Sequence, residues 1–472
     1  MKILLANPPG LWLRCRWDIK LPKGAANYFP YPVRLAYATS VLKKHGYDAH
    51  IVDATASEMT RKEFLKKVRE IKPDLIVWET TASSFEHDLK TMKMIKKFNS
   101  KIKFAASGYH ATPAYNECVN AGYDFAIVGE CEYSILGLVR WLNKEEKSFP
   151  AGVAAKGQKF RPRPLIQDLD ELPWPERDEL PMDKYNDPKL HGFNVVMITS
   201  RGCPWGCNFC TVETYYRQKS YRMRKDVNDI VNEMEYLWNK YKPDELYFDD
   251  DNFSINESHV KKICKELIRR KSKVKWNCMA DAKISYNTLK IMRDAGCTGI
   301  TIGAESADDK VLKQLEGKPI TRKDIKEFVE SCNKLGLRTH LCWVLGMKGS
   351  TKESDRETIE FAINLPSDTL QFSVCMPFPG TRLNKWCKDN DLFVETDWKN
   401  FIANTECVVD LPGYTHDQIK ENLNLANKLW YRKMVTKRPD IIVFHFYNLY
   451  KYKGLKGAAK VLLNSVIKPK GN

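Results

Sequence analysis

Three cysteines, Cys203, Cys207 and Cys210, lie in the short stretch RGCPWGCNFC, residues 201–210. Thiolates are soft ligands that favour iron–sulfur clusters or zinc. A closed structural zinc site takes four ligands, whereas a [4Fe–4S] cluster held by three cysteines keeps one iron free to bind something else. The loop therefore predicts an iron–sulfur site. A zinc knuckle is the alternative, but no His or fourth Cys follows at zinc-finger distance.

The C-x3-C-x2-C spacing, with the aromatic Phe209 before the last cysteine, resembles the cluster loop of the radical S-adenosylmethionine (SAM) superfamily. The resemblance implies that the three cysteines hold a [4Fe–4S] cluster whose free iron chelates SAM, with Phe209 at the SAM site. In that family an electron from the cluster splits SAM. The 5′-deoxyadenosyl radical that is released takes a hydrogen atom from the substrate. The spacing defines the family and leaves the substrate open.

The cysteine loop follows an apolar segment, NVVMITS (194–200), which we expect to be a buried strand. A functional loop at the C-terminal end of a first β-strand is what an α/β barrel predicts. Amphipathic helices alternate with five further strands, expected at 245–251, 274–280, 299–306, 338–346 and 369–377. Six strands in this arrangement resemble the partial (β/α)6 barrel of radical SAM enzymes.

Carboxylates end two of these strands. Asp249, Asp250 and Asp251 close the second strand, where the family resemblance places a group that receives the SAM ammonium. The alternative is a cluster of helix N-caps. Glu305 in GAES matches the family position that binds the SAM ribose, and a carboxylate suits two vicinal hydroxyls because it accepts both hydrogen bonds. We expect Asp249, Asp250 and Glu305 to bind SAM.

Strands and helices also alternate through the N-terminal part of the chain. Apolar strands are expected at 2–6, 48–54, 74–80, 102–108 and 125–130, with helices near 33–45, 60–71, 86–98 and 132–144. This spacing predicts a doubly wound parallel sheet of the Rossmann or flavodoxin-like kind, with ligands at the C-terminal strand ends.

Five segments in this part, NPPG, VRLAYATSVLKKHGY, PDLIVWETT, SGYHATPAYNE and VGECE, resemble in their order the B12-binding domain that precedes many radical SAM domains. The resemblance covers about residues 1–145. It implies cobalamin contacts from the strand ends, at Thr80, Thr81, Ser107, Gly108, Tyr109, His110, Gly129 and Glu130. The D-x-H-x-x-G motif is absent, so we expect no histidine below the cobalt. His110 is either a cofactor neighbour or a structural hydrogen-bonder, and a flavodoxin-like domain without cofactor is the alternative.

The chain thus divides into a cobalamin-binding domain (1–145), a linker (146–190), a radical SAM partial barrel (191–380) and a mainly helical C-terminal extension (381–472). The linker is rich in proline and charge and is expected to connect rather than pack. The arm at 12–32, with Arg14, Arg16 and Trp17, either reaches toward an anionic substrate or packs on the surface. The basic, aromatic stretch 440–472 is expected to cap the barrel, with membrane contact as the alternative.

Composition sets further bounds. The 472 residues include 76 Lys+Arg against 59 Asp+Glu, a net charge of +17 that favours an anionic partner or reflects solvated lysine-rich helices. No nucleic-acid module signature appears. Fourteen cysteines are scattered and the first residues, MKILLANPPG, are broken by prolines, so we expect neither secretion nor a membrane span but a reducing cytoplasm.

Together the two resemblances imply a cobalamin-dependent radical SAM enzyme with a [4Fe–4S] cluster, SAM and cobalamin as cofactors. The expected reaction is methylation of an unactivated carbon through the deoxyadenosyl radical and methylcobalamin. A cyclase or ring-rearranging enzyme is the alternative, and a non-catalytic cobalamin or redox sensor is a third. Expected partners are a small-molecule or lipid-like substrate and a flavodoxin or ferredoxin as electron donor, with peripheral membrane contact as an option and no nucleic acid.

Overall fold

The N-terminal sheet has five parallel strands in the order β4-β1-β5-β6-β7, and an antiparallel strand, β8, extends its edge. The strands are β1 (Lys2–Asn7), β4 (Asp48–Asp53), β5 (Leu75–Glu79), β6 (Lys103–Ser107), β7 (Phe125–Ile127) and β8 (Val153–Ala154). The computed structural model describes residues 1–10, 12–13, 19–20, 30–187, 192–443, 446–447 and 450. In this flavodoxin-like order the winding reverses between β1 and β5, where ligands bind at the carboxyl ends. The predicted doubly wound sheet is confirmed.

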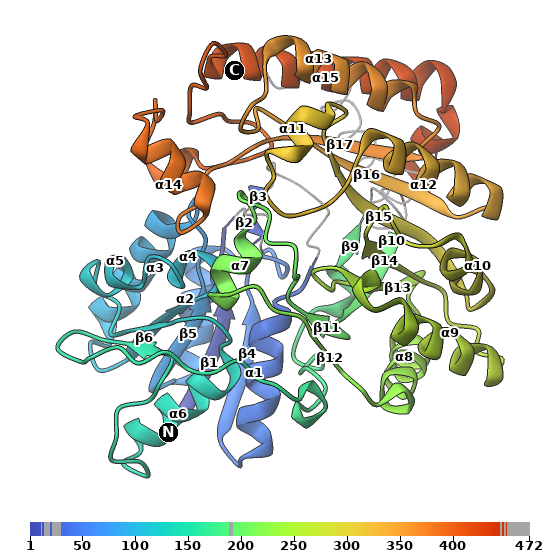
Figure 1. Cartoon of the computed structure of the whole chain (residues 1–472). Coiled ribbons are helices and arrows are strands. Elements are labelled where there is room, and N and C mark those ends of the chain that lie inside the picture. The colour runs from blue at the N-terminus through green and yellow to red at the C-terminus, as the bar shows by residue number, and fades with distance from the viewer. Residues whose placement is uncertain are drawn as a thin grey trace.

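Helices cover both faces of this sheet (Figure 1). They are α1 (Val33–Lys44), α2 (Arg61–Ile71), α3 (Phe85–Phe98), α4 (Gly108–Ala111), α5 (Tyr115–Asn120) and α6 (Glu132–Leu142). Their ends follow local signals. For example, α2 begins at a capping box in which Thr60 and Glu63 satisfy each other's backbone N–H groups. The short helix α4 starts directly at the carboxyl end of β6 and so brings residues 108–111 to the ligand edge of the sheet.

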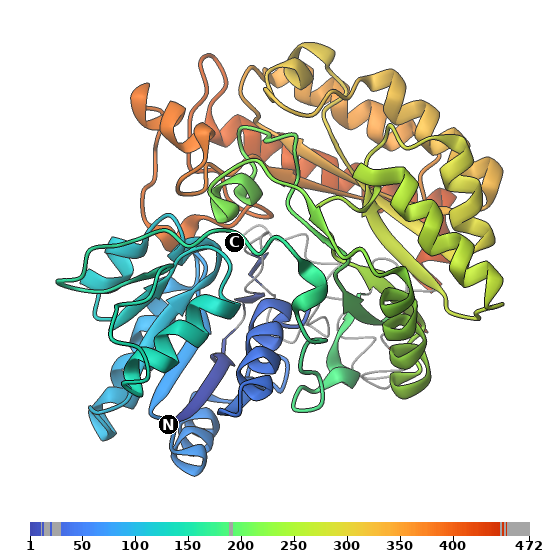
Figure 2. The same ribbon diagram turned by 60° about the horizontal axis from the view of Figure 1, so that its bottom comes forward.

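The second sheet is an open half-barrel of six parallel strands in chain order, with a short antiparallel strand at one edge. Its strands are β10 (Gly192–Met197), β13 (Glu245–Phe248), β14 (Trp276–Ala280), β15 (Cys297–Glu305), β16 (Arg338–Leu345) and β17 (Thr369–Val374), with β9 (Asn186–Asp187) at the edge. The outer helices are α8 (Val227–Tyr241), α9 (Glu257–Arg269), α10 (Tyr286–Asp294), α12 (Arg322–Leu335) and α13 (Lys352–Asn364). Figure 2 shows them wrapped around the outside of the curved sheet. The six-stranded partial barrel is confirmed.

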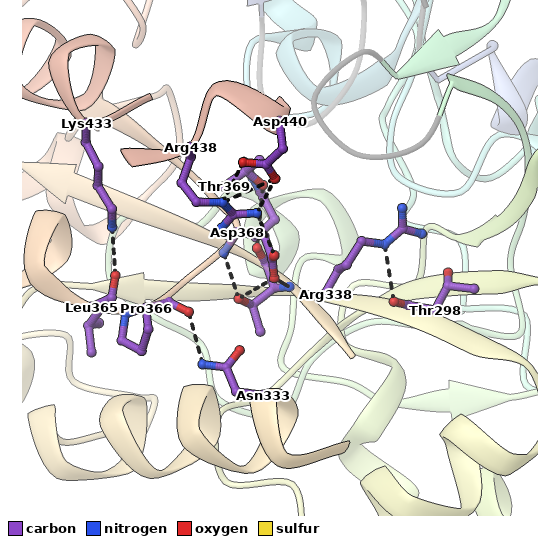
Figure 3. A network of polar contacts seen from close by, with 12 residues as sticks. Thr298, Asn333, Arg338, Leu365, Pro366, Asp368, Thr369, Lys433, Arg438 and Asp440 are labelled. Atoms are coloured by element: carbon purple, nitrogen blue, oxygen red, sulfur yellow. Dashed lines mark hydrogen bonds and ion pairs between the residues drawn. The ribbon is translucent and has the colours of Figure 1, made fainter. Parts of the chain in front are cut away.

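The C-terminal extension contains α14 (Arg382–Asp389), a 3-10 turn η4 (Trp398–Asn400) and the long helix α15 (His416–Lys437), which packs on α13 and β17. Polar contacts fix the end of α15 to the amino-terminal ends of the barrel strands (Figure 3). Lys433 Nζ donates to the Leu365 carbonyl at 2.8 Å, and Arg438 Nη2 lies 3.3 Å from Asp368 Oδ1, just before β17. This network lies at the opposite strand ends from the cysteine loop.

Two expectations fall partly outside the described residues: the arm with Arg14, Arg16 and Trp17, and most of the stretch 440–472. Among the helices that the structure does describe, none combines the length and apolar character needed to cross a bilayer.

The segment 146–190 does not behave as a loose linker, and that prediction is wrong for the described part. Its apolar residues Leu169, Leu180 and Met182 are buried. Arg177 Nη2 pairs with Glu233 of α8 at 2.8 Å, while its Nε donates to the Tyr31 hydroxyl at 2.9 Å. The Tyr185 hydroxyl donates to Asp53 at the end of β4, also at 2.9 Å. Prolines keep this segment from forming a regular helix or strand. Its buried apolar residues therefore follow no helix or strand period that the sequence could reveal.

Candidate active site

The cysteine loop runs from β11 (Ser200–Arg201) to α7 (Thr211–Tyr216), and Cys203, Cys207 and Cys210 are all partly exposed. Burial raises the pKa of Cys203 to about 12 and that of Cys207 to about 11. Thiols with such pKa values stay protonated near neutral pH. A Lewis acid such as iron can displace the proton by binding the thiolate sulfur. Among the described residues, no three His, Cys, Asp or Glu side chains converge on one point as a single metal ion requires. The thiolates of a four-iron cluster instead bind different irons.

Carboxylates at the end of β13 hold the chain where it enters this loop. Asp250 is fully buried and accepts hydrogen bonds from Thr199 N (2.7 Å), Thr199 Oγ1 (2.6 Å) and Ser200 Oγ (2.7 Å). Both its oxygens are therefore occupied, and the expectation that Asp250 binds SAM is wrong. Asp251 accepts from Gly202 N at 2.7 Å. Asp249 is partly exposed and stays a predicted SAM contact.

The loop between α11 (Asp309–Lys313) and α12 supports the cysteine loop from another side. Asn208 N donates to the Leu315 carbonyl at 3.0 Å. Gly317 is so close that a Cβ there would lie 2.5 Å from the Trp205 carbonyl oxygen and 2.9 Å from Cys207 N. Only glycine allows this backbone approach. Arg382 of α14 completes the support with a hydrogen bond to the Gly206 carbonyl.

Glu305 ends β15 in an unusual conformation. Its φ is +63°, the left-handed region that non-glycine residues seldom adopt and that clusters at functional sites. The carboxylate is buried, which raises the pKa of Glu305 against the lowering effect of Lys318, whose Nζ lies 3.7 Å from Oε1. Lys318 in turn donates to the Gly303 carbonyl. A carboxylate can accept two hydrogen bonds from vicinal hydroxyls, and binding of the SAM ribose by Glu305 stays a prediction.

Phe209 is partly buried against the main core. Lys318 was not predicted as a functional residue, because it lies in the loop GKP, which has no periodic pattern around it. The one feature of the sequence that could identify Lys318 is its position directly after Gly317.

At the ligand edge of the N-terminal sheet, buried polar atoms lack partners. Asn7 Oδ1, Thr80 Oγ1 and both ring nitrogens of His110 make no hydrogen bond to any described residue. Asn7 ends β1, while Thr80 and His110 follow β5 and β6, and each of the three is at most 6% exposed. Burial lowers the pKa of His110 to about 4, so the imidazole is neutral. Orphaned buried polar atoms cost free energy unless a ligand satisfies them. The edge therefore fits a large polar ligand such as cobalamin.

The C-terminal extension covers one side of this edge. The Trp398 ring of η4 lies edge-on 5.5 Å from the His110 ring, and Phe85 lies 4.8 Å away on another side. Trp398 Nε1 donates to Glu117 Oε1 of α5 at 2.7 Å. A residue of the C-terminal extension thus packs on two helices, α4 and α5, that belong to the N-terminal domain.

Four other predicted cobalamin residues make contacts within the fold. Thr81 Oγ1 bonds to Ser84 Oγ, and Ser107 Oγ donates to the Trp78 carbonyl, both at 3.1 Å. Their hydroxyls stabilise the strand-end turns. Gly108 and Gly129 have φ of +96° and +78°, so these turns need glycine.

Glu130 has a different role from the predicted one. Its Oε1 pairs with Arg201 at 3.0 Å and its Oε2 with Arg222 at 2.8 Å, while Ile166 N donates to the same carboxylate. Arg201 also pairs with Glu132 at 2.7 Å. All four charged side chains are buried. Glu130 therefore ties the N-terminal domain to the residues on both sides of the cysteine loop, and its carboxylate is not available for cobalamin, which corrects our expectation.

The two candidate cofactor sites share a wall. Tyr109, at the start of α4, packs against Tyr215 of α7 with ring centroids 4.7 Å apart and the ring planes tilted by 35°. Val212, Tyr215 and Tyr216 form a small apolar cluster against which Tyr109, Cys203 and Cys210 all pack. Figure 1 shows α7 between the N-terminal sheet and the barrel. One short helix, α7, therefore contacts both the cysteine loop and the ligand edge of the N-terminal sheet.

A three-cysteine loop on the first strand of an open barrel, joined to a flavodoxin-like sheet with a polar ligand edge, defines a radical SAM enzyme that binds cobalamin. The radical SAM superfamily profile matches residues 197–362, and the B12 binding domain profile matches residues 20–139. The chain belongs to the radical SAM superfamily, within the group that carries a B12-binding domain. Its cofactors are a [4Fe–4S] cluster, SAM and cobalamin, as predicted.

Among known proteins, an uncharacterized methyltransferase of Pyrococcus horikoshii is 30% identical over 455 residues, 94% of this chain and 95% of the relative. The anaerobic magnesium-protoporphyrin IX monomethyl ester cyclase of Cereibacter sphaeroides is 26% identical over 389 residues, 79% of this chain and 63% of the cyclase. Both a methyltransferase and a cyclase are thus relatives of this chain.

Among solved structures, the radical SAM methyltransferase TsrM from Kitasatospora setae superimposes with a TM-score of 0.68 at 17% identity. The match covers 84% of this chain and 77% of TsrM in the structure with tryptophan and a SAM analogue. TsrM has also been solved with cobalamin and a [4Fe–4S] cluster. At this identity the likeness shows a shared fold over the part of the chain that it covers.

Proposed function

We propose that this protein is a cobalamin-dependent radical SAM methyltransferase that methylates an unactivated carbon of a small molecule. The observation that carries the proposal is the wall shared by the two cofactor sites, where Tyr109 and two of the cysteines pack on the same side chains. A radical made at the cysteine loop and a methyl group carried at the sheet edge must reach the same substrate atom, so the two sites must be neighbours.

The proposed site roles follow from the contacts. Cys203, Cys207 and Cys210 would hold the cluster, while Asp250 and Asp251 fix the loop that carries them. Glu305 would accept hydrogen bonds from the SAM ribose and Lys318 would offset its buried charge. When bound, the cluster and SAM supply the hydrogen-abstracting radical and cobalamin supplies the methyl group. A flavodoxin or ferredoxin would deliver the electron.

On the cobalamin side, Thr80 and His110 have free hydrogen-bonding atoms for the cofactor. The neutral imidazole of His110 can donate from one nitrogen and accept at the other. The positive φ values of Gly108 and Gly129 set the turns that end this edge.

The test is anaerobic reconstitution followed by incubation with reductant and SAM that carries a labelled methyl group, against a panel of candidate small molecules. We expect one cobalamin per chain, deoxyadenosine formation, and label in the product. Cys207→Ala should abolish both the cluster absorbance and SAM cleavage. Failure of the wild type to bind cobalamin would refute the proposal, as would deoxyadenosine formation with a converted substrate that carries no label.

A radical cyclase is the second candidate, because a cyclase is among the relatives. It predicts deoxyadenosine and a rearranged product without the labelled methyl group. A sensor without catalysis predicts cobalamin binding with no SAM cleavage, and it gives no reason for a strained, buried Glu305 beside the cysteine loop.

A further inference from the structure

Arg34 of α1 lies at the wall between the two candidate cofactor sites. Its guanidinium carbon is 4.8 Å from the Tyr109 ring centroid and 4.5 Å from that of Tyr215. Tyr109 belongs to the ligand edge of the N-terminal sheet and Tyr215 follows the cysteine loop. Two tyrosine faces thus hold one cation at the wall that the two candidate cofactor sites share.

Four other arginines at the boundary between the two sheets are buried, and every one has a carboxylate partner. The pairs are Arg177–Glu233, Arg201–Glu132, Arg222–Glu130 and Arg224–Glu233. Arg34 differs from all of them. No carboxylate in the described part of the chain forms an ion pair with it, although the negative charge of Asp251 acts on it.

The tyrosine faces satisfy the charge of Arg34 in part, since cation–π contacts stabilise a guanidinium without using its N–H groups. A guanidinium carries five N–H donors in a fixed fork that matches a carboxylate or a phosphate. Arg34 is partly exposed, so an incoming ligand can reach these donors. The unused donors are therefore suited to an anionic group that is not part of the protein.

We propose that Arg34 recognises a carboxylate or phosphate group of the substrate at the junction of the cobalamin and SAM sites. The assignment rests on the proposed methyltransferase function and narrows its substrate to an anionic small molecule. The same chemistry can come from two other sources, the phosphate of cobalamin and the carboxylate of SAM, and the experiment separates them.

The experiment uses holoenzyme loaded with cluster and cobalamin and saturated with SAM, so that both cofactor anions are already bound. Inorganic phosphate, pyrophosphate and glutarate are titrated anaerobically at low ionic strength by calorimetry. We expect at least one probe to bind the wild type once per chain. Arg34→Gln should weaken this binding about tenfold or more, because a charge-assisted hydrogen bond is lost. Arg34→Lys should bind in between, because it keeps the charge but not the fork.

Arg69→Gln is the matched control. Arg69 also stacks on an aromatic ring, that of Phe98 at 4.4 Å, but it is exposed on α2. It should bind the probe as the wild type does, which excludes an effect of net charge alone.

The assignment is overturned if no probe binds the wild type, or if Arg34→Gln binds as tightly as the wild type. It is also overturned if Arg34→Gln loses cobalamin or binds SAM more than threefold more weakly, because Arg34 then serves a cofactor. Cobalamin loading of the wild type is measured first. A failure there refutes the proposed function and this assignment together, whereas a failure of the anion titration alone leaves the proposed function standing.

Discussion

Glu132 and Arg201 form a buried ion pair, 2.7 Å from Oε1 to Nη2, across the boundary between the two sheets. Glu132 is the first residue of α6 and Arg201 lies two positions before Cys203. Because Arg201 also pairs with Glu130, the segment that leads into the cysteine loop is tied to the end of β7. The position of the cluster loop relative to the N-terminal sheet is thus set by buried charges.

Removing Arg201 should be costly for stability. Arg201→Gln leaves Glu132 buried without its partner and takes one of two from Glu130, which costs about 3 to 5 kcal/mol. Urea denaturation of the apoprotein measures this loss. Arg269→Gln, an exposed residue of α9, should change the free energy of unfolding by less than about 0.5 kcal/mol. Equal stability of the two variants would contradict the assigned role.

Lys318 should matter for SAM and not for the cluster. Lys318→Met leaves the buried Glu305 carboxylate without its cation, so we expect SAM affinity to fall about tenfold or more. Cluster absorbance should stay at the wild-type level. Equilibrium dialysis with labelled SAM gives the affinity, and Lys318→Arg should recover part of it. Parallel loss of cluster and SAM would show instead that Lys318 supports the loop.

Gly317 should be required for cluster assembly. A methyl group in Gly317→Ala would overlap the backbone of Trp205 and Cys207, so the loop must shift and iron content should fall well below the wild-type value. Gly413→Ala is the control, since Gly413 has a φ of +73° but no neighbour within 4 Å. That variant should lose some stability and keep its iron. Full iron loading of Gly317→Ala would count against the predicted support.

Asp355 should make stability depend on pH. Its carboxylate is buried at the start of α13, where it accepts from Gly346 N and the Tyr414 hydroxyl, and burial raises its pKa from 3.8 to about 6. The folded state therefore holds the proton more tightly than the unfolded chain, so this stabilisation is present below about pH 4 and is lost as the pH rises through 6.

Asp355→Asn cannot titrate but keeps an oxygen for Gly346 N. Relative to the wild type, its free energy of unfolding should increase by about 2 kcal/mol between pH 4 and pH 7. Urea titrations of the two apoproteins at several pH values measure the difference. A constant difference across this range would show that Asp355 does not carry the shift.

The order of strands and the cysteine loop were predictable because period and spacing are local properties of a sequence. The roles of the side chains at the strand ends were less predictable. Asp249, Asp250 and Asp251 are alike in the sequence. Asp250 differs from its neighbours only by its burial, and its carboxylate accepts hydrogen bonds from Thr199 and Ser200. Glu130 similarly has the sequence position of a cobalamin contact. Its carboxylate instead pairs with Arg201 and Arg222, which are distant in the sequence.

Long-range contact also explains the residues that were missed. Arg34 is one cation in a helix and acquires its position only when Tyr109 and Tyr215 close on it from two other segments. Lys318 and Gly317 become informative once their loop lies against the cysteines. None of these contacts has a signature in spacing, so they require the folded chain.

The contact between Trp398 and His110 has a consequence for how the protein is made. The N-terminal sheet leaves the ribosome before the barrel and can fold as a unit, as domains generally do during synthesis. Yet one side of its ligand edge is supplied by a tryptophan nearly three hundred positions later, bonded to Glu117. The N-terminal sheet is thus completed by a segment that is translated much later, and one side of its ligand edge stays open until the residues near 398 have been made.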